Sequence, residues 1–151
     1  MVQSEAPEEE TLPPRILVVD DDPHIRRLII AALKRDGYAF LQAANGQEAL
    51  DAMRAEHPDV VVLDLMMPVV SGWDVLRQRM QDMQLSRIPV ILVSANRDPE
   101  IVEAIDRGIC AFLPKPFDID VLASLVRTCI TVSDRDRHRD PNAGDRDEER
   151  L

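Results

Sequence analysis

Polar residues that could do chemistry follow several aliphatic runs of this 151-residue chain. They are two neighbouring acids, a third acid, a hydroxyl and an amine: Asp20, Asp21, Asp64, Ser94 and Lys115. One run, residues 60–63, leads directly into Asp64, and Pro68 follows it. An unbroken aliphatic run is typical of a strand buried on both faces, in the middle of a parallel sheet. Ligands of open α/β sheets bind just beyond the carboxyl ends of the strands, where Asp64 is predicted to lie.

These residue types together favour phosphoryl transfer. Three carboxylates held close together repel one another unless positive charge lies among them, and a hard cation such as Mg²⁺ supplies it. Lys115 adds a second positive charge, and Ser94 adds a hydroxyl for a ligand oxygen. In this reading Asp64 is the nucleophile and forms an acyl phosphate. The plainer alternative is that the acids only cap a helix, for which one acid is enough.

Five strands alternating with five helices are predicted over residues 15–131. The strands are expected at 15–19, 38–43, 60–64, 89–94 and 109–113. The helices are expected at 23–36, 46–55, about 73–83, 98–108 and 118–131. This alternation indicates a parallel sheet with helices on both faces. All the strands then end at one edge, where polar residues far apart in the sequence can meet.

Composition sets the limits of the folded part and of its surroundings. Residues 1–14 and 132–151 are polar and charged, so both are expected to be disordered segments flanking one domain. The net charge of -10 argues against direct nucleic-acid binding. No apolar run is long enough to cross a membrane. A cytoplasmic location is expected, with Cys110 and Cys129 as reduced, buried, small hydrophobic residues.

In four stretches the chain resembles the receiver domains of two-component response regulators. The stretches are Val18-Val19-Asp20-Asp21, Leu63-Asp64 with Met67-Pro68, Val93-Ser94-Ala95 and Lys115-Pro116-Phe117. The resemblance implies a flavodoxin-like (βα)5 fold, a doubly wound parallel sheet with strand order 2-1-3-4-5. A stand-alone, single-domain receiver is expected, because the segment after residue 131 is too short and too polar to be a second folded domain.

The resemblance implies a role for each residue of the site. Asp20 and Asp21 would hold Mg²⁺, for which Mn²⁺ can substitute, and Asp64 would be both metal ligand and phosphoacceptor. The backbone carbonyl of Met66 would complete the protein's metal ligands. Ser94 and Lys115 would bind the phosphoryl oxygens, and Phe112 would change rotamer on activation. The Lys115–Pro116 peptide bond would be cis.

Three positions depart from the family pattern. Ser71-Gly72 stands where Asp-Gly is usual, and the glycine is expected to carry the turn. Gly108-Ile109 stands where Gly-Ala is usual, so a larger side chain must be packed there. Pro114 lies inside the fifth strand, and an edge strand tolerates its missing N–H.

The function predicted is that of a phosphorylation-dependent signalling switch. A histidine kinase or a histidine phosphotransfer protein would donate the phosphoryl group, and an unknown output protein would be contacted. The chain would not be an enzyme beyond catalysing its own phosphorylation and slow dephosphorylation, and it could form a phosphorylation-linked dimer. The alternative is a degenerate receiver that only binds partners. A haloacid-dehalogenase-type phosphatase is rejected, because Met66 stands where that family has a second Asp.

Overall fold

The computed structural model describes residues 12–95 and 109–138, with side chains to residue 130. Five strands form one parallel sheet in the order β2-β1-β3-β4-β5. They are β1 (Arg15–Val19), β2 (Ala39–Ala43), β3 (Val60–Asp64), β4 (Val90–Ser94) and β5 (Ala111–Pro114). The predicted fold class and strand order are confirmed. The last strand, β5, is an edge, and Pro114 is its final residue, so the missing N–H interrupts no ladder on its outer side.

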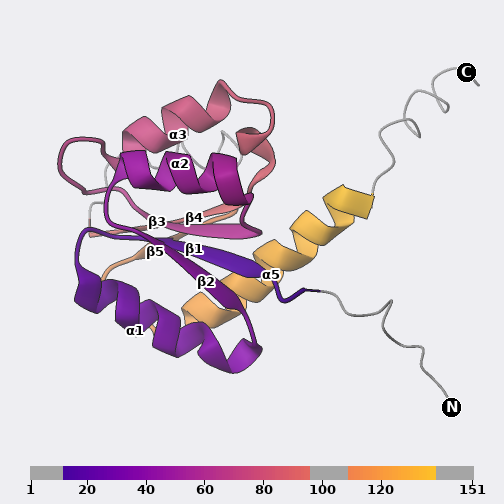
Figure 1. Ribbon diagram of the computed structural model, residues 1–151. Helices are drawn as coiled ribbons and strands as arrows, with labels where there is room; N and C mark the ends of the chain where they lie inside the picture. Colours follow the sequence, from indigo (N-terminus) through magenta and orange to yellow (C-terminus); the bar gives the residue numbers. More distant parts are fainter. Residues whose placement is uncertain (1–11, 96–108, 139–151) are drawn as a thin grey trace, which may run out of the picture.

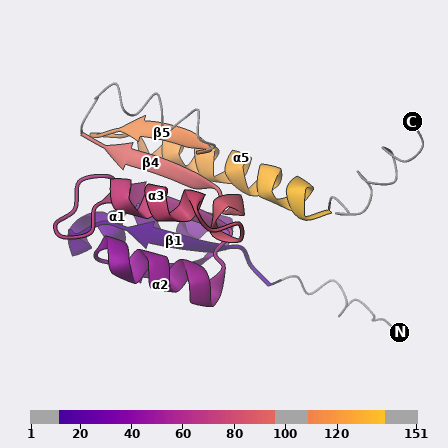
Figure 2. The same ribbon diagram turned by 90° about the horizontal axis from the view of Figure 1, so that it is seen from above.

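Helices cover both faces of the sheet. α2 (Gly46–Glu56) and α3 (Gly72–Met80) lie on one face, and α1 (Pro23–Leu33) and α5 (Ile119–His138) lie on the other (Figures 1 and 2). Two short 3-10 turns, η2 (Lys34–Asp36) and η3 (Leu85–Arg87), complete the described elements. The helix predicted at 98–108 lies outside the described residues.

The two ends of α1 follow from local sequence. The Asp22 carboxylate accepts the His24 N–H at 2.8 Å, and Pro23 occupies the first helical position. The α-helix ends at Leu33, and η2 continues it to Asp36. Gly37 then ends η2 in a left-handed conformation with φ 80°. The helix predicted over 23–36 is therefore an α-helix followed by one tighter turn.

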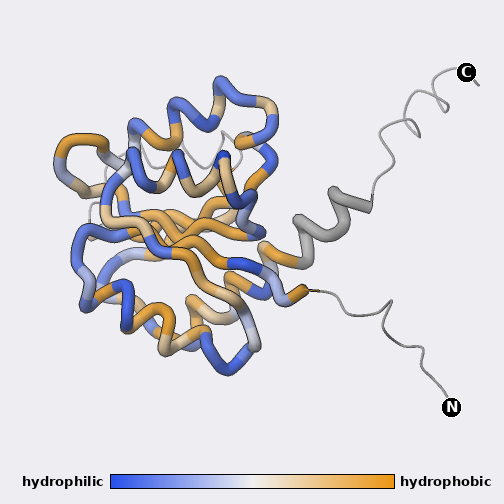
Figure 3. Tube along the Cα trace, viewed as in Figure 1, coloured by the Kyte–Doolittle hydropathy of each residue, from blue (hydrophilic) through white to orange (hydrophobic). Residues whose placement is uncertain are grey.

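Alternate side chains of each strand enter two separate cores. In β1, Leu17 and Val19 belong to the core under α2 and α3, whereas Ile16 and Val18 belong to the core under α1 and α5. Both faces are apolar, so the strands form the hydrophobic centre of the molecule (Figure 3). The buried helical residues include Ala49, Leu50, Met53 and Val75 on one face, and Ile29, Leu33, Leu122 and Val126 on the other.

The buried face of α3 differs from the predicted one. Trp73, Leu76, Met80 and Met83 are spaced for one apolar face of a helix, but Met80 and Met83 are exposed. Arg79 is buried instead, and its guanidinium donates to the carbonyls of Ser86 and Ile88 at 2.9 and 2.8 Å. A long side chain can bury its aliphatic stem when such carbonyls satisfy its charged end. The helix is therefore rotated by about one residue from the expected orientation.

The expectation of reduced cysteines is wrong. Cys110, just before β5, and Cys129, in α5, form a disulfide, with their Cα atoms 6.1 Å apart. The two residues are 19 positions apart, and no pattern in the sequence marks them as a pair. Only the packing of α5 across the sheet brings them together.

The last helix is longer than predicted. α5 continues to His138, seven residues into the segment expected to be disordered, and it projects beyond the sheet (Figure 1). The spacing of Val121 with Leu122, Leu125 and Val126 predicts a place on the buried stripe of this helix, but Val121 is exposed. Within the described part of the chain, no helix combines the length and apolar character needed to cross a membrane.

Candidate functional site

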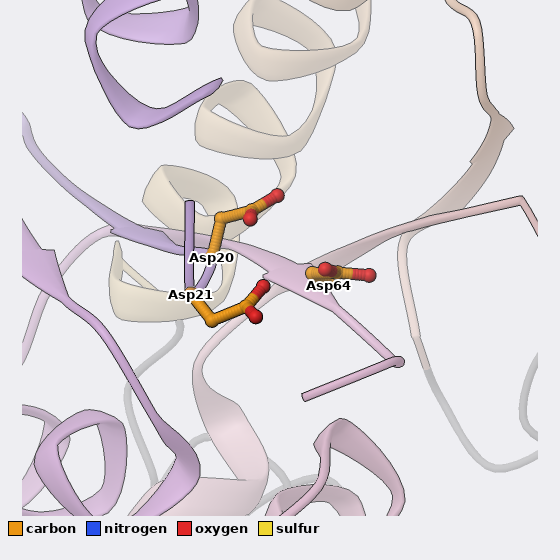
Figure 4. Close-up of side chains that lie close together, drawn as sticks. All are labelled: Asp20, Asp21 and Asp64. Carbon is orange, nitrogen blue, oxygen red and sulfur yellow. The ribbon is translucent and has the colours of Figure 1, made fainter. Parts of the chain in front are cut away.

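Three acids meet at the carboxyl edge of the sheet. Asp20 and Asp21 directly follow β1, and Asp64 ends the neighbouring strand β3. One oxygen from each carboxylate can be chosen so that all three lie within 4.8 Å of one another (Figure 4). Asp20 and Asp64 are buried, whereas Asp21 is exposed. The cluster is therefore closed toward the core and open on the side of Asp21.

Lys115, which directly follows the edge strand β5, contacts two of these acids. Its ammonium lies 3.1 Å from an Asp20 oxygen and 3.5 Å from an Asp64 oxygen. The other oxygen of Asp20 accepts the N–H of Asp22 at 2.9 Å, and that of Asp64 accepts the N–H of Met66 at 3.1 Å. Each buried carboxylate is thus held by one backbone donor and one shared cation.

The pKa values of Asp64 and Lys115 are both raised above their ordinary values. Burial raises the pKa of the Asp64 carboxyl, and the charge of Asp20 adds to this, while the Met66 N–H and Lys115 oppose it. Burial lowers the pKa of Lys115, but its hydrogen bond to Asp20 and the charges of both acids outweigh this, so the pKa is raised. Lys115 remains an ammonium at neutral pH, and the anionic form of Asp64 is the one that burial disfavours.

Ser94 lies beside this cluster at the end of β4, and Phe112 lies within β5, opposite Leu92. Ser94 ends β4 and is fully buried, one strand away from Asp64. Its carbonyl accepts the N–H of Lys115 at 3.0 Å, which holds the start of the Lys115–Pro116 segment against β4. Phe112 is half-buried and packs against the core under α2 and α3. The peptide bond Lys115–Pro116 is cis, as expected.

Gly72 allows α3 to begin against the backbone of the third acid. A Cβ at this position would lie 2.6 Å from the Cα of Leu65, a distance that real contacts do not show. The Gly72 N–H also donates to the Leu65 carbonyl at 3.1 Å. The glycine is therefore needed for close approach to the chain next to Asp64, and not for the turn conformation that the sequence suggested. Ser71 and Asp74 close a reciprocal capping box over this start.

The donor set fits a hard divalent cation. Carboxylate oxygens are the ligands that Mg²⁺ and Mn²⁺ prefer, and Mg²⁺ usually keeps several waters. The exposed side at Asp21 leaves room for water, and the charges of three acids exceed the single charge of Lys115. Asp20, Asp21 and Asp64 are therefore the residues that would hold the cation.

The family model of the response regulator receiver domain matches residues 16–127. This match spans the five strands except Arg15, and all the described helices except the part of α5 after residue 127. The chain belongs to the response regulator receiver domain family. Receiver domains mediate phosphorylation-dependent signalling in two-component systems, and the family typically uses Mg²⁺.

Curated relatives and solved structures agree with this membership. The chain is 39% identical over 121 residues to the response regulator MprA of Mycolicibacterium vanbaalenii, covering 79% of the chain and 51% of that protein. It is 34% identical over 123 residues to the DNA-binding dual master transcriptional regulator RpaA of Synechocystis, covering 81% of the chain and 51% of RpaA. Among solved structures, the receiver domain of the Francisella response regulator 1452 is 33% identical with a TM-score of 0.71, covering 80% of the chain and 98% of that domain. The chemotaxis protein CheY4 of Vibrio cholerae is 29% identical with a TM-score of 0.70, covering 78% and 99%.

These relatives leave two expectations without support. The chain spans about half the length of the curated relatives it matches, so a stand-alone receiver does not follow from them. Some of those relatives are named as DNA-binding regulators, so the absence of a nucleic-acid partner does not follow either.

The unusual Ile109 is accommodated, because it is buried in the core under α2 and α3.

The structure brings together every predicted charged residue of the site and also shows one that was not predicted. Arg26 of α1 contacts the backbone of Asp20. Its position in the sequence carries no signal for this contact, because an arginine on an amphipathic helix is ordinarily a solvated residue.

Proposed function

We propose that this receiver domain accepts a phosphoryl group on Asp64 from a phosphohistidine of a histidine kinase or a histidine phosphotransfer protein. The observation that carries the proposal is the position of Asp64 in the acidic cluster, buried at a strand end and 3.5 Å from the Lys115 ammonium. A carboxylate in this position can attack from the strand edge while positive charge lies beside it.

In the proposed reaction an Asp64 oxygen attacks phosphorus and the P–N bond to the donor imidazole breaks. The electron pair of that bond returns to the imidazole nitrogen, which takes a proton from water. The Met66 N–H holds the other Asp64 oxygen and so orients the attacking one. Lys115 moves its charge toward the transferred phosphoryl oxygens, and the Ser94 hydroxyl approaches another. A bound Mg²⁺ would neutralise phosphoryl charge, held by Asp20, Asp21, Asp64 and the carbonyl of Met66.

The phosphorylated domain then signals through a changed protein surface. Phosphorylation adds nearly two negative charges beside Ser94 and Lys115. When Ser94 approaches the phosphoryl group, the half-buried ring of Phe112 can change rotamer and alter the surface around β5 and α5. An output protein, or a second copy in a phosphorylation-linked dimer, would recognise this surface. The domain turns over no separate substrate and only catalyses its own phosphorylation and dephosphorylation.

The direct test is incubation with acetyl phosphate and Mg²⁺, followed by intact mass measurement. The wild-type protein should gain one phosphoryl group, and chelation of the metal should prevent this gain. The Asp64→Asn protein should gain none, because an amide cannot form the acyl phosphate. A matched control is Asp51→Asn, which changes an exposed acid of α2. An unmodified wild-type protein would instead favour the degenerate receiver that only binds partners.

A further inference from the structure

We propose that Arg26 is a positioning residue that sets the geometry of the acidic pair for Mg²⁺. The inference rests on the proposed function, because it concerns the metal site of the phosphoacceptor. Arg26 lies in the first turns of α1 and is half-buried. Its Nη1 donates to the backbone carbonyl of Asp20 at 2.6 Å, and its Nε donates to the side-chain oxygen of Gln42 at 3.0 Å.

The contact is made where the sheet no longer supports the chain. Pairing between β1 and β2 ends at Val19 and Ala43, and one further bond joins the Asp20 N–H to the Ala43 carbonyl at 3.2 Å. The next carbonyl, that of Asp20, accepts from Arg26 instead of from a strand. Gln42 belongs to β2. Through the guanidinium, this strand therefore also fixes the peptide group that follows Asp20.

That peptide group is the one between the two acids. Its carbonyl belongs to Asp20 and its N–H to Asp21, so its orientation determines how the two carboxylates lie relative to each other. The Asp20 side chain is already held by Asp22 and Lys115. Asp21 is exposed, so its position depends mainly on the backbone. Arg26 therefore restricts the less constrained member of the pair.

Positioning and simple electrostatics predict opposite results when Arg26 is replaced. Arg26 carries a positive charge near a cation site, so its removal would tighten Mg²⁺ binding if charge alone mattered. If Arg26 positions the pair, its removal loosens Asp21 and weakens binding. Gln42→Leu separates the two effects further, since it releases the Nε contact without changing any charge.

The test is calorimetric titration of the full chain with Mg²⁺, in four proteins. Wild type is the reference, and Arg26→Met and Gln42→Leu are the test variants. Arg27→Met is the matched control, because it removes the same charge from an exposed neighbour on the same helix. We expect Arg26→Met to raise the Kd three- to tenfold, Gln42→Leu to raise it about twofold, and Arg27→Met to leave it unchanged or slightly lower. Arg26→Lys, which can still donate to the carbonyl, should recover part of the loss.

A second readout needs no metal. The amide resonance of Asp21 reports on the same peptide group, so it should shift in Arg26→Met and Gln42→Leu and not in Arg27→Met. Unchanged or tighter Mg²⁺ binding in Arg26→Met, matching Arg27→Met, would overturn the inference while wild-type phosphorylation left the proposed function standing. If Arg26→Met does not fold, the result for Gln42→Leu decides. A wild-type protein that binds no Mg²⁺ would overturn both proposals.

Discussion

At the scale of single residues, the charge of Asp64 is a cost to the folded protein that the metal would relieve. Burial and the neighbouring Asp20 raise its pKa, and the single cation of Lys115 is shared with Asp20. A carboxylate held in this way is available as a nucleophile. It is also a source of repulsion whenever no cation is bound.

Without divalent metal, Asp64→Asn should be more stable than wild type at pH 7. Because the pKa of Asp64 is raised in the folded state, that state binds more protons than the unfolded chain in the window above the ordinary value of 3.8. The wild-type protein therefore loses stability as the pH rises through this window, whereas the asparagine variant has no group at this position that titrates. Urea denaturation with a chelator at pH 7 and pH 3 measures the difference, which should shrink at the lower pH. A less stable variant at pH 7 would contradict this account.

Met66→Asn should shorten the lifetime of the phosphorylated protein two- to tenfold, a change of about 0.4–1.4 kcal/mol in barrier. Met66 follows the acceptor by two positions, and the residue is 58% exposed, while its N–H donates to the Asp64 carboxylate. A thioether cannot orient the attacking water well, and its apolar bulk shields the phosphoryl group. An amide can hold that water molecule by hydrogen bonds. Decay of phosphoprotein after removal of the donor measures the effect. Asn96, which is two positions past Ser94 and is expected to flank the same path of attacking water, lies outside the described residues. Equal or slower decay in the variant would show that Met66 does not control hydrolysis.

At the scale of elements, the segment between β3 and α3 combines tight packing with an unfavourable backbone conformation. Gly72 brings the start of α3 against the chain after Asp64, and the Gly46 N–H at the start of α2 donates to the Val70 carbonyl at 3.0 Å. Between these anchors, Val69 has φ 67°, a left-handed conformation that a β-branched residue rarely adopts. The residue is 97% exposed, so little packing compensates for the conformation.

Val69→Gly should stabilise the domain by about 1 kcal/mol. Glycine adopts the left-handed region without steric cost, although part of the gain is offset by the greater freedom of the unfolded chain. Val69→Ala is the matched control, because it removes the exposed side chain and keeps a Cβ in the strained position. It should gain less than the glycine variant. Urea midpoints of the three proteins give the comparison, and a glycine variant no more stable than the alanine variant would contradict it.

At the scale of the whole molecule, one covalent link joins the edge of the sheet to the helix that crosses it. The disulfide between Cys110 and Cys129 ties the approach to β5 to α5. Cys129 is buried in the core under α1 and α5, and Cys110 packs against the same core. The link therefore supports the side of the molecule whose surface is proposed to change on phosphorylation.

Reduction of this disulfide should lower the free energy of unfolding by about 3 kcal/mol, the chain-entropy value for a loop set by a separation of 19 residues. Denaturation with and without dithiothreitol measures the loss. A variant carrying both Cys110→Ser and Cys129→Ser should be less stable than the oxidised protein and should not respond to the reductant. An unchanged wild-type midpoint on full reduction would contradict the prediction.

Local patterns were enough to predict the strands and most of the site. Unbroken aliphatic runs identify β1, β3 and β4 because buried parallel strands need apolar residues on both faces. The ends of these runs identify Asp20, Asp64 and Ser94, since the carboxyl ends of parallel strands share one edge. The family resemblance supplied what spacing alone could not, including the strand order and the cis bond at Lys115–Pro116.

Other features arise only when distant elements pack. The rotation of α3 that buries Arg79 depends on carbonyls at Ser86 and Ile88, and the partner of Cys110 is decided by where α5 crosses the sheet. The same is true of Arg26, whose two hydrogen bonds join α1, β2 and the end of β1. Periodicity records which side of an element is apolar. The specific hydrogen bonds and covalent links between elements depend on distances that exist only in the folded chain.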